Sequence, residues 1–307
     1  MSLTPHARLT LATDSSLCKN WGCDRHPATR EEISLGSATN LARRNAPNGT
    51  CHICGTHGKL SFEHIPPARA FNNNKVQRVP FDEMIKIGPD DPLPHGTQEQ
   101  RGAGAYTLCE KCNNNTGSWY GSAFVSLCYQ ASELLIKSEL HPTLLYPYYI
   151  YPLRIIKQII CMFLSVNRSG MQSTHQDLVG FVLNRYRSYL PDRYRFFLYY
   201  NVEGIIRHQN HMARFEFGSG RVVGFSEITY PPFGYVMTID NDAPDRRLVE
   251  ISHFANYGYD DLEMLQLRLE VLPTHLWVPG DYRSKDEIRE AIASDVKQSS
   301  EESQAVV

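Results

Sequence analysis

The alternation of apolar and polar positions predicts helices between residues 116 and 190 and strands after residue 194. Apolar residues recur at helical spacing over residues 116–137, 153–166 and 176–190. After residue 194, short apolar runs bounded by Gly, Pro, Asn or Asp predict strands. These runs are residues 195–201, 204–208, 213–217, 222–228, 235–240, 248–254 and 265–272. The pattern therefore predicts an α+β fold whose second half contains a mainly antiparallel sheet.

The same pattern predicts how the chain is organised into domains. Residues 1–47 are polar and show little periodicity, so we expect a leader that is partly disordered. Residues 48–137 form a unit rich in Cys and Asn, and residues 138–293 form a second α+β domain. Residues 141–152, rich in Tyr and Pro, are expected to connect the two domains and to pack between them. Residues 294–307 are rich in Ser, Gln and Glu and are expected to be a disordered tail.

Composition and charge exclude several classes of protein. With 42% hydrophobic and 21% charged residues, the 307-residue chain is typical of a globular protein and unlike collagen or a coiled coil. The net charge of −2 means that any contact with nucleic acid must use a local basic patch. The most apolar stretch, residues 144–153, contains two prolines and is too short to span a membrane. Because no apolar signal segment follows the first residues, we expect a cytoplasmic protein without a membrane partner.

Four of the eight cysteines form two Cys-x-x-Cys pairs, which are Cys51/Cys54 and Cys109/Cys112. The cytoplasm keeps thiols reduced, so disulfides are not expected in these pairs. Two such pairs predict one zinc site with four thiolate ligands. Cys128 and Cys161 lie in apolar stretches and are expected to be buried as small hydrophobic residues.

The residues around the two pairs form a longer motif. Between the pairs lies Ser61-Phe62-Glu63-His64-Ile65-Pro66-Pro67, and Asn113-Asn114-Asn115 follows the second pair. In this order, residues 51–120 resemble the zinc-stabilised form of the HNH endonuclease family, which is built on a ββα-metal motif. The resemblance implies an enzyme that hydrolyses phosphodiester bonds in DNA with Mg²⁺ or Mn²⁺. It also implies, by analogy alone, a role in restriction or in defence against phage.

The resemblance assigns a role to each matching residue. His64 matches the general base that activates water, and Glu63 and Asn113 match the ligands of the catalytic metal ion. The structural zinc ligands are matched by Cys51, Cys54, Cys109 and Cys112. These residue types suit the chemistry, because Mg²⁺ prefers oxygen ligands and a neutral imidazole accepts a proton near neutral pH. Neighbouring strand residues point to opposite faces, so Glu63 and His64 can share one site only at a twist or a strand end.

The chain departs from the family pattern in two places. The family's middle Asn, which orients the loop of the base, is replaced here by Gly104. Residues 72–74 are three asparagines that offer an alternative, although nothing in the sequence requires it. The second departure is an insertion of 44 residues between His64 and Cys109. We expect it to form a loop, either a lid or an element that faces the substrate, and its acidic segment is residues 88–94.

Several alternatives remain open at this stage. Two Cys-x-x-Cys pairs also occur in zinc modules without enzymatic activity that bind nucleic acid or protein, where Glu63 and His64 would be surface residues. A nuclease directed at RNA is a third hypothesis. Asn114 and Asn115 are expected to cap a helix that starts near Thr116. The second domain is expected to supply targeting, regulation or self-association, or to bind a protein partner.

The basic residues are concentrated in residues 141–230, which hold ten Lys plus Arg against five Asp plus Glu. Arg185-Tyr186-Arg187 and Arg193-Tyr194-Arg195 lie in this segment, and such alternation is found on nucleic-acid surfaces. It is also typical of amphipathic elements whose Tyr rings are buried and whose Arg side chains are solvated, and we favour this second interpretation. His208 and His211 lack a third metal ligand at suitable spacing and are expected on a surface turn.

Overall fold

In the computed structural model, the described residues are 46–79, 83, 96–139, 143–216, 220–276 and 278–294. The chain from Ala46 onward forms one compact unit. Three predicted segments lie outside the described residues: the leader as far as residue 45, the loop at residues 88–94 and the tail from residue 295. Among the described residues, no helix combines the length and the hydropathy needed to cross a membrane.

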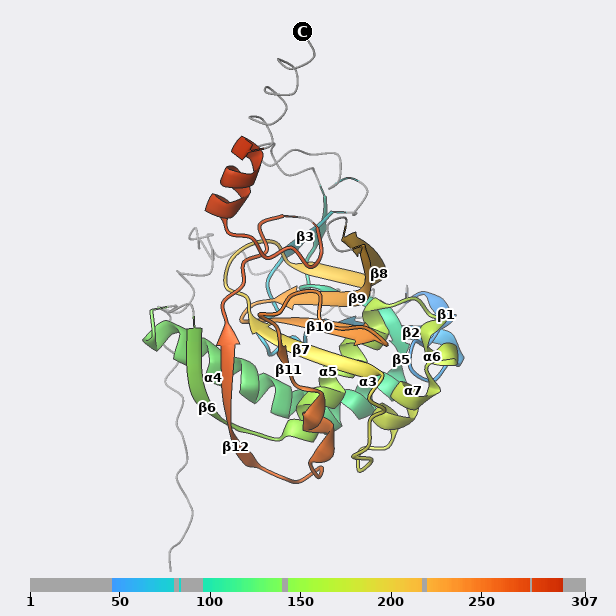
Figure 1. The fold of residues 1–307 in the computed structure, drawn as a ribbon. Helices are drawn as coiled ribbons and strands as arrows, with labels where there is room; N and C mark the ends of the chain where they lie inside the picture. Colours follow the sequence, from blue (N-terminus) through green and yellow to red (C-terminus); the bar gives the residue numbers. More distant parts are fainter. Residues whose placement is uncertain are drawn as a thin grey trace, which may run out of the picture. The chain divides into compact units, whose positions relative to one another are not determined.

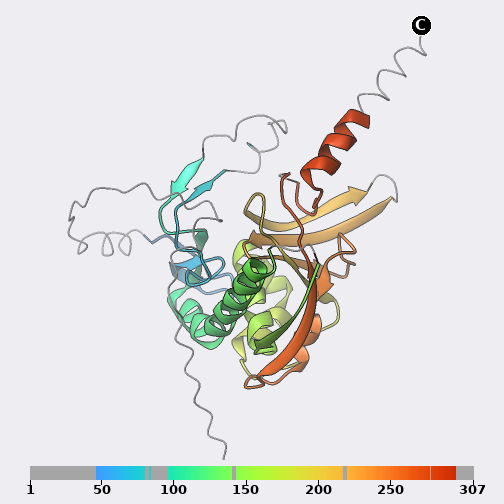
Figure 2. The ribbon, with the colours of Figure 1, turned by 90° about the vertical axis from the view of Figure 1, so that its left-hand side faces the viewer.

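The Cys- and Asn-containing unit is a small antiparallel sheet followed by a long helix (Figure 1). The sheet has the order β1-β2-β5, with β1 at Asn48–Thr50, β2 at His57–His64 and β5 at Gly104–Cys109. Within the insertion, β3 (Val76–Arg78) and β4 (Thr97–Glu99) form a ribbon that extends away from this sheet (Figure 2). The helix runs through α3 (Glu110–Thr116), a π-helical segment (Gly117–Gly121) and α4 (Ser122–Lys137).

This helix begins earlier than the apolar periodicity predicts. It starts at Glu110, directly after Cys109, so that the second cysteine pair spans the junction between strand and helix. Asn114 and Asn115 therefore lie inside α3, and their predicted role as caps is wrong. Helical periodicity detects only the apolar stripe of a helix. Because the first turns of this helix are polar, the pattern did not reveal its start.

The second half contains the predicted antiparallel sheet, which has five strands in the order β11-β7-β10-β9-β8. They are β7 (Tyr194–Tyr200), β8 (Arg207–Glu216), β9 (Arg221–Tyr230), β10 (Phe233–Ile239) and β11 (Val249–Glu250). Strands predicted at residues 204–208 and 213–217 are one strand, β8, whose register shifts between Gln209 and Met212. His208 and His211 thus lie on a strand and not on a turn. The predicted strand at residues 248–254 is mostly replaced by a 3₁₀ helix, Ser252–Asn256.

The predicted connector is a strand. Residues Thr143–Ile150 form β6, which pairs antiparallel with β12, Glu263–Glu270, and β6 lies against α4 (Figure 2). Local pattern cannot reveal this pairing because the partner strand is distant in sequence. On the other edge of β6, the side-chain amide of Gln130 from α4 donates to the carbonyl of Tyr149 at 2.9 Å and accepts from its N–H at 2.9 Å.

Helix α5, Pro152–Val166, is the centre of the apolar core. It contacts the π-helical segment, α4, β5, β8 and α7 (Gln176–Leu183). One core cluster joins Leu60, Leu108 and Phe124 of the first predicted domain to Phe163 and Tyr235 of the second. The two predicted domains therefore share a core, and independent folding of residues 138–293 stays a prediction.

Candidate functional site

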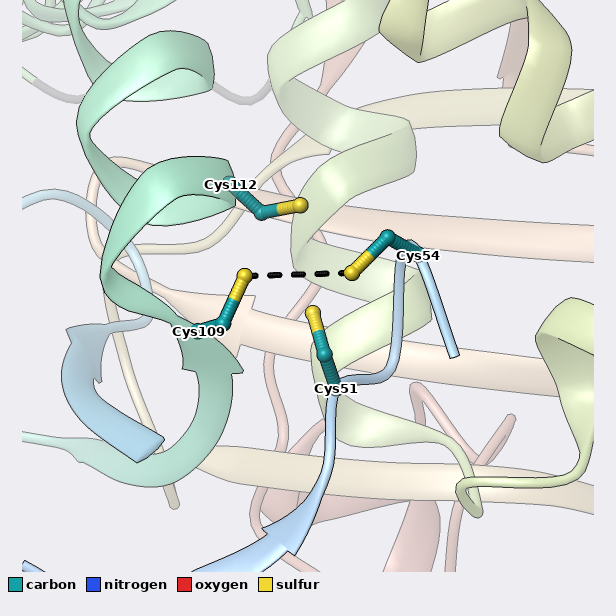
Figure 3. Close-up of side chains that lie close together, drawn as sticks. All are labelled: Cys51, Cys54, Cys109 and Cys112. Carbon is teal, nitrogen blue, oxygen red and sulfur yellow. Dashed lines mark hydrogen bonds between the residues drawn. The ribbon is translucent and has the colours of Figure 1, made fainter. Parts of the chain in front are cut away.

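Four cysteine side chains converge between the β1–β2 turn and the start of α3 (Figure 3). Their sulfur atoms all lie within 4.8 Å of one another, and the Sγ atoms of Cys54 and Cys109 are 3.8 Å apart. All four are free thiols. In a tetrahedral site with Zn–S bonds of about 2.3 Å, the sulfurs are separated by about 3.8 Å. The cluster therefore fits a metal ion such as zinc, as the spacing of the two pairs predicts.

The backbone around the first pair holds its sulfurs on one side of a tight turn. Cys51 follows the last residue of β1, and its N–H donates to the carbonyl of Thr56 at 3.0 Å. Gly55 closes the turn by donating to the carbonyl of Cys51 at 2.9 Å. Its φ of 73° lies in the left-handed region, which other residues adopt only with strain. Gly55 is therefore required directly after Cys54.

The second pair uses the junction between β5 and α3. Cys109 is the last residue of β5 and the N-cap of α3, and Cys112 lies in the first turn of that helix. The unpaired N–H groups and the dipole at a helix N-terminus favour thiolates, and hence metal binding. Cys112 is buried, while Cys109 is partly exposed. A rigid strand end and a helix start thus fix the second half of the cluster.

Cys51, Cys109 and Cys112 lie so close together that the ionisation of one thiol affects the others. A hydrogen bond from Cys112 lowers the pKa of Cys51 to about 4, and the same interaction raises the pKa of Cys112. Burial raises the pKa of Cys109. The thiol of Cys112 therefore favours the thiolate form of Cys51, which is the form that binds a metal ion.

His52, between the first two cysteines, attaches the cluster to the rest of the fold. Its backbone N–H donates to the carbonyl of Thr107 at 2.9 Å. Its Nδ1 lies 3.2 Å from the carbonyl oxygens of both Leu164 and Ser165, at the end of α5. Because carbonyls only accept hydrogen bonds, this nitrogen carries the proton. The cysteine cluster is thereby fixed both to β5 and to the central helix.

His64, the predicted general base, is half-buried at the end of β2. Its Nε2 donates to the backbone carbonyl of Arg101 at 3.0 Å, and its ring contacts the edge of Phe62 with centroids 4.9 Å apart. Desolvation lowers the pKa of His64 below its usual 6.5. The imidazole is therefore neutral at pH 7, with its proton on Nε2. The lone pair of Nδ1 is left to accept a proton.

Glu63 points to the opposite face of β2 and is only 7% exposed. Among the described residues, no hydrogen-bond donor or cation contacts its carboxyl group. Burial raises the pKa of Glu63 to about 8. Burial also raises the pKa of Cys161 on α5, and the charge of Glu63 adds to that effect. Without a cation, Glu63 is therefore mainly protonated at neutral pH.

Asn113 ties α3 to β2 directly before Glu63. Its Nδ2 donates to the Oγ of Ser61 at 3.0 Å and to the carbonyl of Phe62 at 3.1 Å. Its Oδ1 accepts no hydrogen bond from the residues that the structure describes. These hydrogen bonds hold Asn113 against the strand that carries Glu63 and His64. Its amide oxygen remains available to bind a ligand.

Asn72 is a functional candidate that the sequence singled out only as one of three asparagines. It is fully buried, whereas Asn73 and Asn74 are exposed. Its Nδ2 donates to the carbonyls of Pro66 at 2.6 Å and Ala103 at 2.7 Å, and its Oδ1 accepts from the N–H of Ala103 at 2.7 Å. It thus ties the loop after His64 to the segment that contains the Arg101 carbonyl.

The neighbouring Gly102 explains why that segment can approach so closely. Its φ is 95°, and a Cβ atom there would lie 2.4 Å from the carbonyl oxygen of Asn72. Only glycine fits at this position. The glycines near residue 103 are the sequence signal for the contact, but they do not indicate which Asn makes it.

The cysteine cluster stands apart from the other candidates as a metal site. Within the described ranges, it is the one group of three or more His, Cys, Asp or Glu side chains close enough to share an ion. Comparisons with known proteins add no relative: no family model, curated protein or solved structure matches the chain. The assignment of Glu63, His64 and Asn113 to one catalytic site therefore stays a prediction.

Proposed function

We propose that the protein is a metal-dependent endonuclease of the HNH type that hydrolyses phosphodiester bonds in DNA, with His64 as the general base. The observation that supports this most is the hydrogen bond from Nε2 of His64 to the carbonyl of Arg101. It selects the tautomer in which Nδ1 is an acceptor, and desolvation keeps the ring neutral. A base of this kind removes a proton from the attacking water near neutral pH.

The residues proposed to hold the catalytic ion are Glu63 and Asn113. Glu63 is a buried carboxyl group that has no partner among the described residues, and Asn113 has an amide oxygen that accepts no hydrogen bond there. Both are oxygen donors of the type that Mg²⁺ and Mn²⁺ prefer. When bound, such an ion stabilises negative charge on the scissile phosphate and on the leaving oxygen.

The surrounding residues position the base and contact the phosphate. Asn72 holds the loop after His64 against the segment of Arg101. The exposed guanidinium of Arg101 lies 5.8 Å from the centre of the Phe62 ring, on which the His64 ring also packs. Arg101 is therefore the cation best placed to bind a phosphate next to the base. The zinc site would stabilise this small motif by joining the β1–β2 turn to the start of α3.

One observation favours a second function, a zinc module that binds nucleic acid or protein without cleaving it. Glu63 is buried on the face opposite His64, which is the environment of a structural side chain as much as of a metal ligand. In such a module, His64 would only stabilise the loop that contains Arg101.

Incubating supercoiled plasmid with the purified protein separates these functions. We expect nicked or linear DNA in Mg²⁺ or Mn²⁺, no product after EDTA is added, and no product with His64→Ala. His57→Ala is the matched control, because His57 is an exposed histidine on the same strand. Single-stranded RNA in parallel tests an RNA-directed enzyme. Absence of cleavage of DNA and RNA with every metal ion would favour the zinc module.

A further inference from the structure

Arginine and tyrosine side chains alternate in a row on the second half of the molecule. The row consists of Tyr151, Arg154, Tyr259, Arg185 and Tyr186. The Arg154 guanidinium lies 4.3 Å from the ring centre of Tyr151 and 4.1 Å from that of Tyr259. Arg185 lies 5.4 Å from the ring of Tyr259 and 4.7 Å from the ring of Tyr186. We call this row the Arg–Tyr ladder.

The inner end of the ladder is fixed by other contacts. Arg154 donates to Asp260 at 2.6 Å and to the carbonyl of Tyr259 at 2.7 Å. The hydroxyl of Tyr259 donates to the carbonyl of Trp119 at 3.0 Å, in the same continuous helix that carries Asn113. These side chains therefore have little freedom to bind anything else.

The outer end of the ladder is open. Helix α7 ends at Leu183, so the predicted helix to residue 190 is wrong over its last turns. Asn184 accepts a hydrogen bond from the N–H of Tyr186 and starts a loop. Tyr186 is 60% exposed and Tyr189 is 63% exposed, whereas Tyr194 is buried. The sequence interpretation of buried Tyr rings is therefore correct for Tyr194 and wrong for Tyr186.

The charge around the open end is positive. Arg154 and Arg193 pair with Asp260 and Asp240, but no carboxylate pairs with Arg185 or Arg187 among the described residues. Residues 184–193 contain three arginines and one acidic residue. Arg185 also donates to the hydroxyl of Tyr186 at 2.7 Å, so that this exposed ring and its guanidinium form one unit. Tyr189 is a second exposed ring, three residues further along the same loop. Both rings are thus available to a polyanion that also has aromatic faces.

We propose that Tyr186, Tyr189, Arg185 and Arg187 form a surface that binds single-stranded nucleic acid. Exposed rings stack on bases, and guanidinium groups bind phosphates. In a duplex the base faces are covered by their neighbours, so this surface selects unpaired nucleotides. As a site for substrate it rests on the proposed nuclease function, but binding itself does not depend on cleavage.

The test measures binding of a fluorescein-labelled oligothymidine by anisotropy, with full-length His64→Ala protein in Mg²⁺-free buffer. We expect the single strand to bind more tightly than a duplex of equal length. Tyr186→Ala should weaken binding about 5- to 150-fold, the range for losing one stacked base, and Tyr186→Phe should restore it. Arg185→Gln should reduce the salt dependence of binding. Tyr149→Ala is the control, because Tyr149 on β6 is exposed to a similar degree, 63% against 60% for Tyr186.

Two results would overturn the proposal: a Tyr186→Ala protein that binds as tightly as its parent, or a preference for the duplex. Its failure is distinguishable from failure of the nuclease proposal. If the parent cleaves plasmid and Tyr186→Ala does not alter oligothymidine binding, only this surface is refuted. If oligothymidine binding depends on Tyr186 while no substrate is cleaved, the surface stands and the nuclease proposal is refuted.

Discussion

The Nε2 atom of His64 lies 3.0 Å from the carbonyl oxygen of Arg101, a residue of the insertion that separates the histidine from Cys109. Because a backbone carbonyl can only accept, this contact determines which nitrogen of the ring is protonated. The tautomer of the proposed base is thus controlled by a residue of the insertion between His64 and Cys109.

His64→Ala should abolish most cleavage without unfolding the protein. Loss of a general base typically lowers the rate by about 10²–10⁴. The ring is half-buried and makes one hydrogen bond, so the melting temperature and the zinc content should stay close to those of the parent. Plasmid nicking rates, calorimetry and elemental analysis measure these quantities. Equal rates for the parent and His64→Ala would refute the general-base assignment.

Glu63 should make the stability of the Mg²⁺-free protein depend on pH. Its pKa is about 8 in the folded state, against 4.5 for a free side chain. Between these values the unfolded chain has lost the proton and the folded chain keeps it. The free energy of unfolding should therefore fall as pH rises from about 5 to 8, by up to about 1.4 kcal/mol per unit. Urea unfolding at several pH values measures this slope.

Glu63→Gln is the comparison that isolates this effect, because glutamine has similar size and does not titrate. We expect a smaller pH dependence in Glu63→Gln than in the parent. At pH 8, Mg²⁺ should stabilise the parent and have little effect on Glu63→Gln, because an ion bound by the carboxylate favours its charged form. The same response to Mg²⁺ in both proteins would argue against Glu63 as a ligand.

Asn72→Ala should lower both stability and activity. It removes three hydrogen bonds and leaves buried backbone groups of Pro66 and Ala103 without those partners. Each such group costs about 1–3 kcal/mol of stability. Asn73→Ala, at the exposed neighbouring position, should behave like the parent in urea unfolding and in cleavage. If both variants were equally stable and active, Asn72 would have no positioning role.

Each chain should bind one zinc ion through the four paired cysteines. Cys109→Ala should lose the ion and unfold the motif locally, because a structural zinc contributes on the order of 10 kcal/mol to folding in small domains. Cys128→Ala is the control, since Cys128 is buried but distant from the cluster in sequence and should leave the zinc content unchanged. Elemental analysis that finds no zinc in the parent, or disulfides within the pairs, would contradict the assignment.

A chain truncated after Lys137 should not fold into an active unit. The apolar face of α4 packs on α5 and β6, and the Phe124 ring lies 5.8 Å from the ring of Tyr235. Truncation exposes these buried surfaces. Circular dichroism and plasmid nicking test the expectation. A soluble, zinc-loaded fragment that cleaves as the full chain does would show that the first domain is autonomous.

The cysteine cluster could be predicted from sequence because its spacing is local. Each Cys-x-x-Cys pair lies within a few residues of sequence, and only the convergence of the two pairs on one site had to be inferred. Much of the five-stranded sheet was also predictable, because most of its strands are short apolar runs bounded by Gly, Pro, Asn or Asp. The motif around His64 indicated which residues to examine, although it could not indicate that Glu63 would be buried.

Features that depend on distant contacts could not be predicted in this way. The strand character of β6 depends on β12, more than a hundred residues later. The choice of Asn72 among three consecutive asparagines depends on where Ala103 lies in three dimensions. The exposure of Tyr186 follows from the end of α7 at Leu183, which has no Gly or Pro to mark it. In each case, local composition permitted several outcomes.

The hydrogen bonds between Gln130 and Tyr149 cover part of the free edge of β6, where another chain could otherwise pair. An open strand edge is a template on which other chains add strands and grow into fibrils. The outer face of the β6–β12 ribbon also exposes Leu145, Tyr149 and Met264, so such growth would bury apolar surface as well. Gln130 occupies the hydrogen-bonding position of an incoming peptide group. The side chain of Gln130 thus disfavours aggregation through this strand edge.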